Sequence, residues 1–262
     1  AGNCGNALLL PVTPKGTVSL DTAETAVKSG VDLVSLQHAN NETGLIQPLE
    51  ELGGLCQAYG VPFHSDGVQT AGKIPICLHR LPISLYSFSA HKFGGPVGVG
   101  GLYRKEGTAT EPLYRGGMQE KGSRPGTESV LLACGMAAAL TAAVEEMAET
   151  EAYLTSLEEE LLHGLTALGG VPTGEGNRVP GHIHIRFPHR DGEALVSALD
   201  LHGVCLSAGA ACHSRSHTPS ETLLAMGFTK EGASSALRIT LGRENTHEEV
   251  HTFLALLEDC LK

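Results

Sequence analysis

The stretch SFSAHKFGG, residues 87–95, places a single lysine directly after a short β-prone run and just before two glycines. Ser89 and His91 precede the lysine, Lys92, by three positions and one position. A lysine on an ordinary solvated surface needs no such setting, whereas an amine at the end of a strand can hold an aldehyde as a Schiff base. Taken alone, the stretch fits a solvated charge and a reactive amine about equally well, so the rest of the chain must decide.

Strand and helix signals alternate around this stretch. An amphipathic helix is expected from Asp21, where Asp21 and Glu24 have the spacing of a capping box. A second helical pattern runs up to Gly60. Four segments read as strands: 31–37, 61–66, 83–89 and 99–104. Strands that alternate with helices predict an α/β fold with a mainly parallel sheet covered on both faces.

The second half of the chain differs from the first in composition and in its pattern of predicted helices and strands. Residues 127–165 are rich in Ala, Leu and Glu and should be largely helical. After them we expect strands at 182–187, 204–208 and 236–241, and helices at 192–203, around 220–227 and from His247. We place a boundary near residue 148, which gives a large domain at 1–147 and a smaller C-terminal α+β domain at 148–262.

Composition and charge restrict the partners and the compartment. A net charge of −11 over 262 residues gives no general attraction for nucleic acid or for an anionic membrane, and no apolar run reaches the ~18 residues of a membrane span. The seven cysteines are odd in number and scattered, without a C-x-x-C pair. That pattern fits a reducing compartment, so we expect a cytoplasmic protein. The chain begins at Ala1 without the features of a signal peptide, and we expect it to start partway through a protein.

Three polar clusters follow predicted strands, at residues 38–44, 64–69 and 87–95. Asp66 could pair with a protonated ring nitrogen, and Gln69 could bond a ring oxygen, although Asp66 alone reads better as a turn or cap carboxylate. Together with Lys92 and nearby phosphate donors, these residues are the parts that pyridoxal phosphate (PLP) needs. His38 and His64 adjoin the clusters and are expected to hydrogen-bond around the site.

Five motifs, in their order and spacing, resemble a known family. They are HANNETG, FHSDGVQTAGKIP, SFSAHKFGGPVGVGGLY, GGMQEKGSRPGTE and SAGAACHS. The chain resembles the NifS/IscS-type cysteine desulfurases, which are class V PLP enzymes of fold type I, from about residue 8 to the C-terminus. The resemblance implies the PLP-transferase fold type I and a homodimer.

The resemblance also implies roles for individual residues. Asn41 and Arg238 would hold the substrate carboxylate, a task that suits the planar fork of arginine. Thr127 would reach the cofactor of the partner subunit. The implied cofactor ligands are Lys92, which bonds the cofactor aldehyde, Asp66 at the ring nitrogen, Gln69 at the ring oxygen, and Ser89, His91 and Thr127 at the phosphate.

Cys212 is the candidate nucleophile. It lies in a segment of small residues, SAGAACHSRSHTPS, with His213 and Arg215 nearby to favour the thiolate. The context alone leaves a reactive thiol and a small buried hydrophobe equally open, and the second interpretation is the one we give to Cys134 and Cys205. By resemblance, Cys212 would take sulfur from L-cysteine as a persulfide and leave L-alanine. The sulfur would pass to an acceptor protein such as an iron–sulfur scaffold.

Some features leave alternatives open. The family's N-terminal part, with a glycine/threonine phosphate loop and a histidine that stacks on the cofactor, has no counterpart in residues 1–262. A selenocysteine lyase or another class V aminotransferase-like enzyme would keep Lys92, Asp66 and Gln69, and a non-catalytic or fragmentary homologue would keep the fold. His182 and His184 alternate on one strand and could suggest a metal pair, but an ordinary strand is the better interpretation because no third ligand is evident. We therefore expect no metal.

Overall fold

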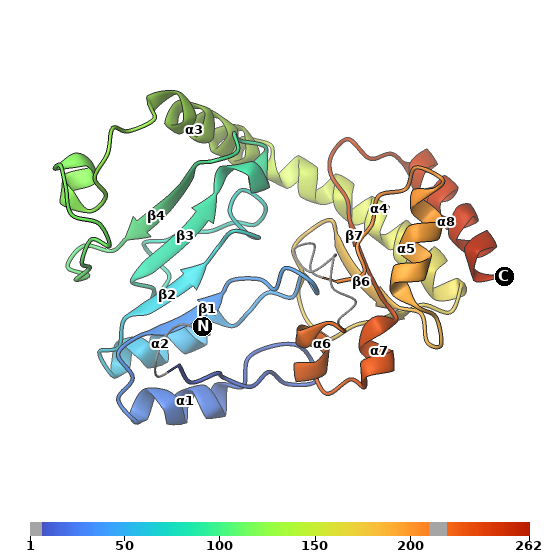
Figure 1. Ribbon diagram of the computed structural model, residues 1–262, viewed down its shortest axis with the longest axis horizontal. Coiled ribbons are helices and arrows are strands. Elements are labelled where there is room, and N and C mark those ends of the chain that lie inside the picture. The colour runs from blue at the N-terminus through green and yellow to red at the C-terminus, as the bar shows by residue number, and fades with distance from the viewer. Residues whose placement is uncertain (1–6, 210–218) are drawn as a thin grey trace. The chain divides into compact units, whose positions relative to one another are not determined.

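The computed structural model describes residues 7–209 and 219–262, and its chain forms two compact units (Figure 1). The lysine unit, residues 27–38 and 49–146, contains Lys92. The arginine unit, residues 1–26, 39–48 and 147–262, contains Arg238. These units differ from the predicted domains, 1–147 and 148–262, because two N-terminal segments group with the C-terminal half. The domain assignment itself stays a prediction.

The lysine unit is built on a four-stranded sheet in the order β1-β2-β3-β4. Its strands are β1 (Val34–Gln37), β2 (Phe63–Asp66), β3 (Leu85–Ser89) and β4 (Gly100–Arg104). β1, β2 and β3 are parallel, and β4 is antiparallel to β3. The α/β fold class is confirmed, and the sheet is parallel in the part that carries the polar clusters.

The helices of the lysine unit are α2 (Leu49–Ala58), the short 3-10 helices η1 (Ala90–Phe93) and η2 (Gln119–Gly122), and α3 (Val130–Glu145), while α1 (Leu20–Lys28) crosses the unit boundary. Of these helices, α2 contacts β2, and α3 contacts η1, the segment with Lys92. Phe93 of η1 is buried with Ala71 and Ala90, and apolar residues of α3 pack against them. This small apolar cluster fixes the segment that contains Lys92, because close-packed side chains leave little room for it to shift.

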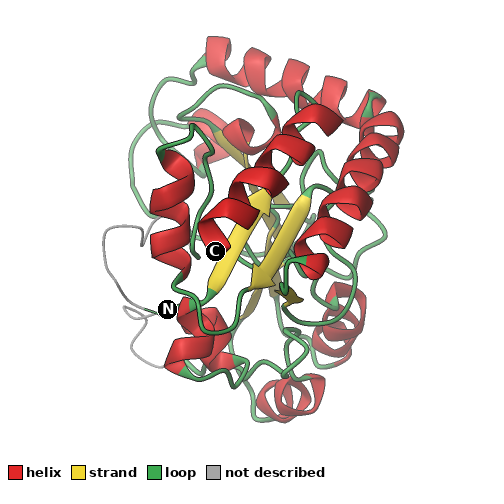
Figure 2. Ribbon diagram, turned by 90° about the vertical axis from the view of Figure 1, so that its right-hand side faces the viewer, coloured by secondary structure: helices red, strands yellow, loops and turns green. Residues whose placement is uncertain are grey.

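The arginine unit has a three-stranded antiparallel sheet of β5 (Val171–Pro172), β6 (His182–Arg186) and β7 (Ala236–Thr240). Three helices, α4 (Met147–Ala167), α5 (Gly192–Asp200) and α8 (His247–Leu261), form a layer over it, as Figure 2 shows. Two short helices, α6 (Glu221–Ala225) and α7 (Lys230–Ser234), precede β7. The core between the layers follows helical spacing on α4, where the buried leucines are Leu154, Leu157, Leu161 and Leu165.

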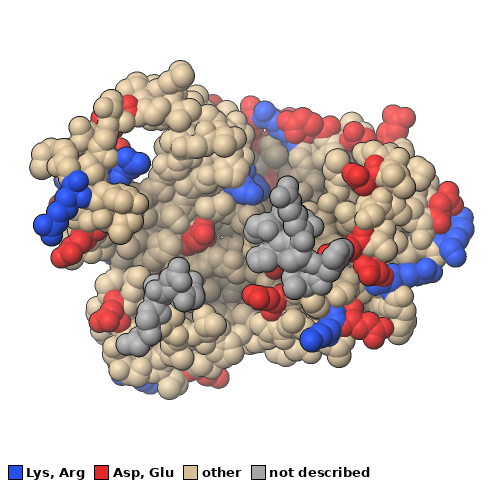
Figure 3. Space-filling view, in the orientation of Figure 1, with Lys and Arg blue, Asp and Glu red and all other residues tan. Residues whose placement is uncertain are grey.

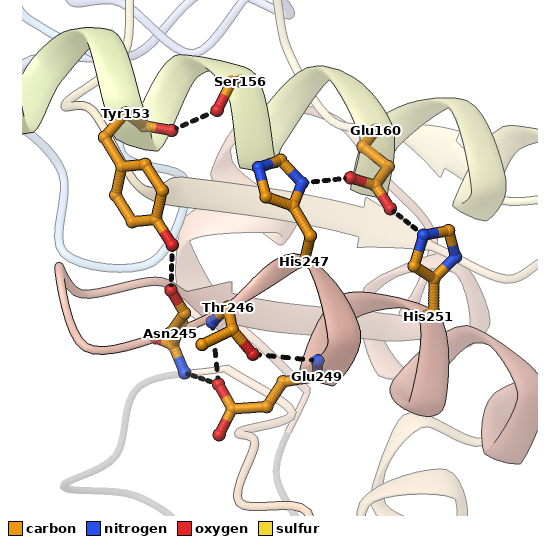
Figure 4. Close-up of polar contacts among 8 residues, drawn as sticks. All are labelled: Tyr153, Ser156, Glu160, Asn245, Thr246, His247, Glu249 and His251. Atoms are coloured by element: carbon orange, nitrogen blue, oxygen red, sulfur yellow. Dashed lines mark hydrogen bonds and ion pairs between the residues drawn. The ribbon is translucent and has the colours of Figure 1, made fainter.

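Polar contacts fix the start of α8 against α4 (Figure 4). Thr246 and Glu249 form a capping box, in which the Thr246 side chain accepts from the Glu249 N–H and the Glu249 carboxylate accepts from the Thr246 N–H. Glu160 of α4 lies between two α8 histidines, with its carboxylate 2.5 Å from His247 Nδ1 and 2.9 Å from His251 Nε2. These contacts add polar links to the leucine packing between the two helices.

The structure refines some local predictions and contradicts others. Residues 127–165 are largely helical as predicted, but they form two helices that meet at Glu146, where neither glycine nor proline marks the break. The strand expected at 204–208 is reduced to a single bridge between Ser207 and Arg238. Helix α1 begins at Leu20, before Asp21, and the N–H of Thr22 donates to Ser19 Oγ.

The cysteine assignments also need correction. Cys134 and Cys205, expected to be buried, are both exposed, whereas Cys56 is buried. Cys134 lies on α3, where apolar residues occur on every side and no residue is fully buried. An evenly apolar helix gives no periodic signal that marks a buried face, so the sequence could not place this cysteine.

Helix length and surface charge bear on the expectation that the chain has neither a membrane nor a polyanion as a partner. Within residues 7–209 and 219–262, no single helix is long and apolar enough to cross a membrane; α3 and α4 satisfy the length and composition only if they are counted together. On the face drawn in Figure 3, lysine and arginine side chains are scattered among acidic ones.

We predict that Thr246→Ala destabilises the arginine unit, because the α8 cap loses the hydroxyl that accepts the Glu249 N–H. The free energy of unfolding should fall by about 1 kcal/mol in urea denaturation. Thr252→Ala is the matched control, since Thr252 is an exposed threonine within α8 whose hydroxyl donates back to the Glu248 carbonyl. An equal loss in both variants would contradict a specific role for the cap.

Candidate functional site

In the lysine unit, the predicted polar residues follow the ends of neighbouring parallel strands. In the strand register Gln37 pairs with Asp66, and Asp66 pairs with Ser87, so the three strands end close to one level. Asp66 is the last residue of β2, and its Oδ1 accepts from the N–H of Val68 at 2.9 Å. Gln69 lies in the turn that follows. The structure thus places Asp66 and Gln69 on one short turn at the carboxyl edge of the sheet.

The segment with Lys92 begins where β3 ends. Ser89 is the residue before η1, and its Oγ lies 2.9 Å from His91 Nδ1 instead of capping the helix backbone. Lys92 lies in the single turn of η1, and Gly94 ends that turn with a φ of 82°. This left-handed conformation explains the first glycine after the lysine, because residues with a Cβ rarely adopt it. Ser89, His91 and Lys92 are therefore held together by one short turn.

Lys73 is a candidate that the sequence analysis missed. Burial lowers the pKa of its ammonium, and the positive charge of Lys92 lowers that pKa further. The second cause shows that the two lysines lie within electrostatic range of each other in the same unit. The only signal in the sequence is its place four residues after Gln69 in QTAGK, which by itself does not distinguish it from a surface lysine.

The residues of this unit fit PLP. Two lysines, a serine hydroxyl and a histidine ring gather near the ends of β2 and β3, and these groups suit an anionic phosphate. A carboxylate and an amide, from Asp66 and Gln69, lie on the adjacent turn and suit the ring nitrogen and ring oxygen. Thr127 lies apart in sequence, exposed in the loop between η2 and α3.

In the arginine unit, the structure brings Asn41 and Arg238 together. Arg238 donates through one terminal nitrogen to the Asn41 carbonyl at 3.1 Å and through the other to Ser207 Oγ at 3.1 Å. Arg238 lies on β7, and its backbone also pairs with Ser207. The guanidinium is thereby oriented from two sides, which suits the binding of a carboxylate.

The loop with Asn41 is held by its neighbours in the same motif. Asn40 Oδ1 accepts from the N–H groups of Glu42 and Thr43 at 2.9 and 2.8 Å. The buried carboxylate of Glu42 accepts from the hydroxyls of Ser220 and Thr222 at 2.5 and 2.8 Å. Polar residues of HANNETG therefore build a rigid loop. Cys212, His213 and Arg215 lie outside the described residues.

His182 and His184 have different surroundings. His182 Nε2 lies 2.7 Å from the Glu42 carbonyl, so this histidine supports the loop with Asn41. His184 pairs across the sheet with Arg238 and is buried, and burial is the main reason that its pKa falls to about 3. In the described part of the chain, no group of three His, Cys, Asp or Glu side chains is arranged to bind a metal.

Comparison with known proteins identifies the family. The family model named Aminotransferase class-V matches residues 3–253. The chain belongs to the class-V aminotransferase family. The cysteine desulfurase IscS of Clostridium botulinum, a curated relative, is 39% identical over 259 residues, which is 97% of this chain. The chain spans 65% of the length of that relative.

Solved structures of similar proteins agree with this family assignment. A NifS-like protein from Rickettsia africae has a TM-score of 0.91 at 30% identity, covering 99% of this chain and 71% of that one. A structure described as SspA in complex with cysteine has a TM-score of 0.76 at 28% identity, covering 92% of this chain and 67% of that one. The predicted class-V, fold type I architecture is confirmed.

We predict that His38 in the lysine unit does not titrate near neutral pH. Burial lowers its pKa from the ordinary 6.5 to about 4, so the ring is neutral in the folded protein while the unfolded chain takes up a proton below 6.5. The unfolded state binds more protons between these values, and the stability contributed by His38 is lost as the pH falls from 6.5 to 4. In an NMR titration, the His38 ring protons should shift only near pH 4; a midpoint near 6.5 would contradict the burial.

Proposed function

We propose that the protein is a PLP-dependent cysteine desulfurase that converts L-cysteine to L-alanine and carries the sulfur as a persulfide on Cys212. The observation that carries this proposal is the grouping of Lys92, Ser89 and His91 on one turn beside the Asp66–Gln69 turn. The names of relatives support the choice of reaction: one is a cysteine desulfurase and another was solved with cysteine.

Each cofactor ligand has a stated task in this proposal. Lys92 would hold PLP covalently through Nζ, Asp66 would keep its ring nitrogen protonated, and Gln69 would bond its ring oxygen. Ser89 and His91 would hold the phosphate in this subunit, and Thr127 would do so from the partner subunit. When bound, PLP supplies an electron sink for the negative charge that develops at the substrate Cα.

The remaining steps belong to the protein's own residues. Arg238 and Asn41 bind and orient the substrate carboxylate. Once the substrate amine has displaced it from the cofactor, the freed Lys92 Nζ would remove the Cα proton and later return a proton to the product carbon. The Cys212 thiolate forms a bond to the substrate sulfur while the carbon–sulfur bond of the substrate breaks. L-Cysteine and a protein thiol thus become L-alanine and a protein persulfide, from which a thiol or an acceptor protein removes the sulfur.

The same proposal extends to assembly and partners. Large apolar side chains that are exposed in the lysine unit support a homodimer, since burial against a second copy would remove their apolar surface from water; they are Leu113, Tyr114, Met118, Val130 and Leu131. An iron–sulfur scaffold is the proposed sulfur acceptor, and the IscS name of relatives supports this choice. The cytoplasm is the proposed compartment, because the odd number and scattered positions of the cysteines fit a reducing environment.

The decisive experiment measures alanine release from L-cysteine by the purified protein with PLP and a thiol reductant. Cys212→Ala should abolish release, with activity lowered at least ~1,000-fold, because no other group is proposed to accept the sulfur. Cys205→Ala, at an exposed position, is the matched control and should keep the parent rate. Alanine from selenocysteine alone would favour a selenocysteine lyase, and no alanine from either substrate would contradict the proposed reaction.

Arg238→Lys should raise the KM for L-cysteine by roughly 10- to 100-fold with a smaller change in kcat, because lysine loses the planar fork that binds a carboxylate at two points. The test is steady-state kinetics on alanine release. Arg243→Lys is the control, since Arg243 lies on the exposed turn after β7 beside Glu244. An unchanged KM in Arg238→Lys would remove Arg238 from the substrate site.

A further inference from the structure

A buried polar cluster in the lysine unit has no role in the reaction described above. Tyr86, the second residue of β3, is only 2% exposed. Its hydroxyl lies 2.7 Å from Thr70 Oγ1 and 2.9 Å from His38 Nδ1, and those two atoms are 3.2 Å apart. Three side chains from three separate segments therefore meet at one point, which we call the tyrosine cluster (His38, Thr70 and Tyr86).

The tyrosine cluster depends on the missing side chain of Gly67. A Cβ placed at Gly67 would lie 1.9 Å from Tyr86 Cζ and 2.1 Å from its hydroxyl oxygen, far inside contact distance. Position 67 must therefore be glycine as long as position 86 is tyrosine, because the tyrosine ring fills the space that a Cβ at position 67 would occupy. Gly67 directly follows Asp66, so the ring of Tyr86 lies against the turn that carries the proposed cofactor ligands.

Main-chain hydrogen bonds also connect the tyrosine cluster to that turn. The N–H groups of Thr70 and Ala71 donate to the Gly67 carbonyl at 3.0 and 2.9 Å. The N–H of His38 donates to the Asp66 carbonyl at 2.7 Å. Two of the three cluster residues thus bond to the turn through the main chain, while their side chains meet at the Tyr86 hydroxyl. Removing the Tyr86 hydroxyl would take away its hydrogen bonds to Thr70 and His38 and so make the turn less stable.

The cluster is also uncharged at neutral pH. Burial lowers the pKa of His38 to about 4 and raises that of Tyr86 to about 12. The distances fit two directions of hydrogen bonding, both without a charge. In the first, the Thr70 hydroxyl donates to Tyr86 and the Tyr86 hydroxyl donates to His38 Nδ1. In the second, His38 Nδ1 donates to Tyr86, Tyr86 donates to Thr70, and the Thr70 hydroxyl donates to the Gly67 carbonyl at 3.2 Å. Either direction fixes one tautomer of His38 and places no charge behind the Asp66 carboxylate.

We propose that His38, Thr70 and Tyr86 are positioning residues that hold the turn from Asp66 to Gln69 in the geometry that binds the pyridine ring of PLP. The importance for PLP rests on the proposed function; the effect on the turn does not. The cluster acts through Asp66 and Gln69 and makes no contact of its own with the ring in this proposal.

The first test is Tyr86→Phe, which removes one oxygen and keeps the ring. In the protein without cofactor, amide hydrogen exchange at Thr70 and Ala71 should become about three- to tenfold faster, because the loss of one buried hydrogen bond is expected to weaken their protection. The 15N shifts of the His38 ring should change from one tautomer to a mixture. Tyr103→Phe, on the neighbouring strand β4, is the matched control and should leave both readouts unchanged.

The second measurement is PLP affinity, followed by the absorbance of the bound cofactor. Tyr86→Phe should bind PLP about three- to tenfold more weakly than the parent, and the pH dependence of the bound absorbance should shift because Asp66 no longer holds the ring nitrogen in the same way. Tyr103→Phe should match the parent. Unchanged exchange, unchanged His38 shifts and unchanged PLP affinity in Tyr86→Phe would overturn the proposal.

A steric test covers the outcome in which Tyr86→Phe does not fold. Gly67→Ala should weaken PLP binding and lower thermal stability, because its Cβ meets the Tyr86 ring. Gly67→Ala combined with Tyr86→Leu should regain the stability but not the full affinity, since the space is restored and the hydrogen bonds are not. Parent-like PLP binding by Gly67→Ala, or by the combined variant, would contradict a positioning role.

The two proposals fail in different ways. If the parent releases no alanine from L-cysteine but exchange at Thr70 and Ala71 responds to Tyr86→Phe, the proposed reaction is wrong and the positioning of the turn stands. If the parent releases alanine and Tyr86→Phe changes neither exchange nor PLP affinity, the reaction stands and the positioning role is wrong.

Discussion

The parallel pairing of β2 with β1 on one side and β3 on the other is the constraint on which the lysine unit depends. Gln37, Asp66 and Ser87 lie level across the three strands. Because parallel strands end at the same edge, the residues that follow each strand must share that edge. The short turn of η1 then adds Lys92 to the set, and the apolar cluster around Phe93 holds that turn in place.

The sequence predicts this arrangement well where local chemistry and strand order agree. β-prone runs followed by polar residues mark the ends of β2 and β3, and the motifs name Asp66, Gln69 and Lys92 without any coordinates. Prediction fails where packing between distant segments decides. Glu146 breaks a helix without glycine or proline, and the apolar α3 gives no sign of which side is exposed. The tyrosine cluster joins residues 38, 70 and 86, and no spacing in the sequence links them.

Lys73 and Glu42 illustrate a second limit of sequence patterns. Both lie inside recognisable motifs, yet a motif does not say which member is buried or what it touches. Burial of Lys73 near another lysine emerges only from the folded chain. Likewise, Glu42 is a carboxylate next to Asn41 in the sequence, and only the structure shows it bonded to Ser220 and Thr222, almost 180 residues away.

The contacts of Glu42 have a consequence for how the arginine unit can change during evolution. The Glu42 carboxylate accepts hydrogen bonds from the Ser220 and Thr222 hydroxyls, which lie about 180 positions further along the chain. A substitution at Glu42 would leave both hydroxyl groups without this acceptor in a partly buried setting, which costs free energy. We therefore expect positions 42, 220 and 222 to change together, although nothing in the sequence itself connects them.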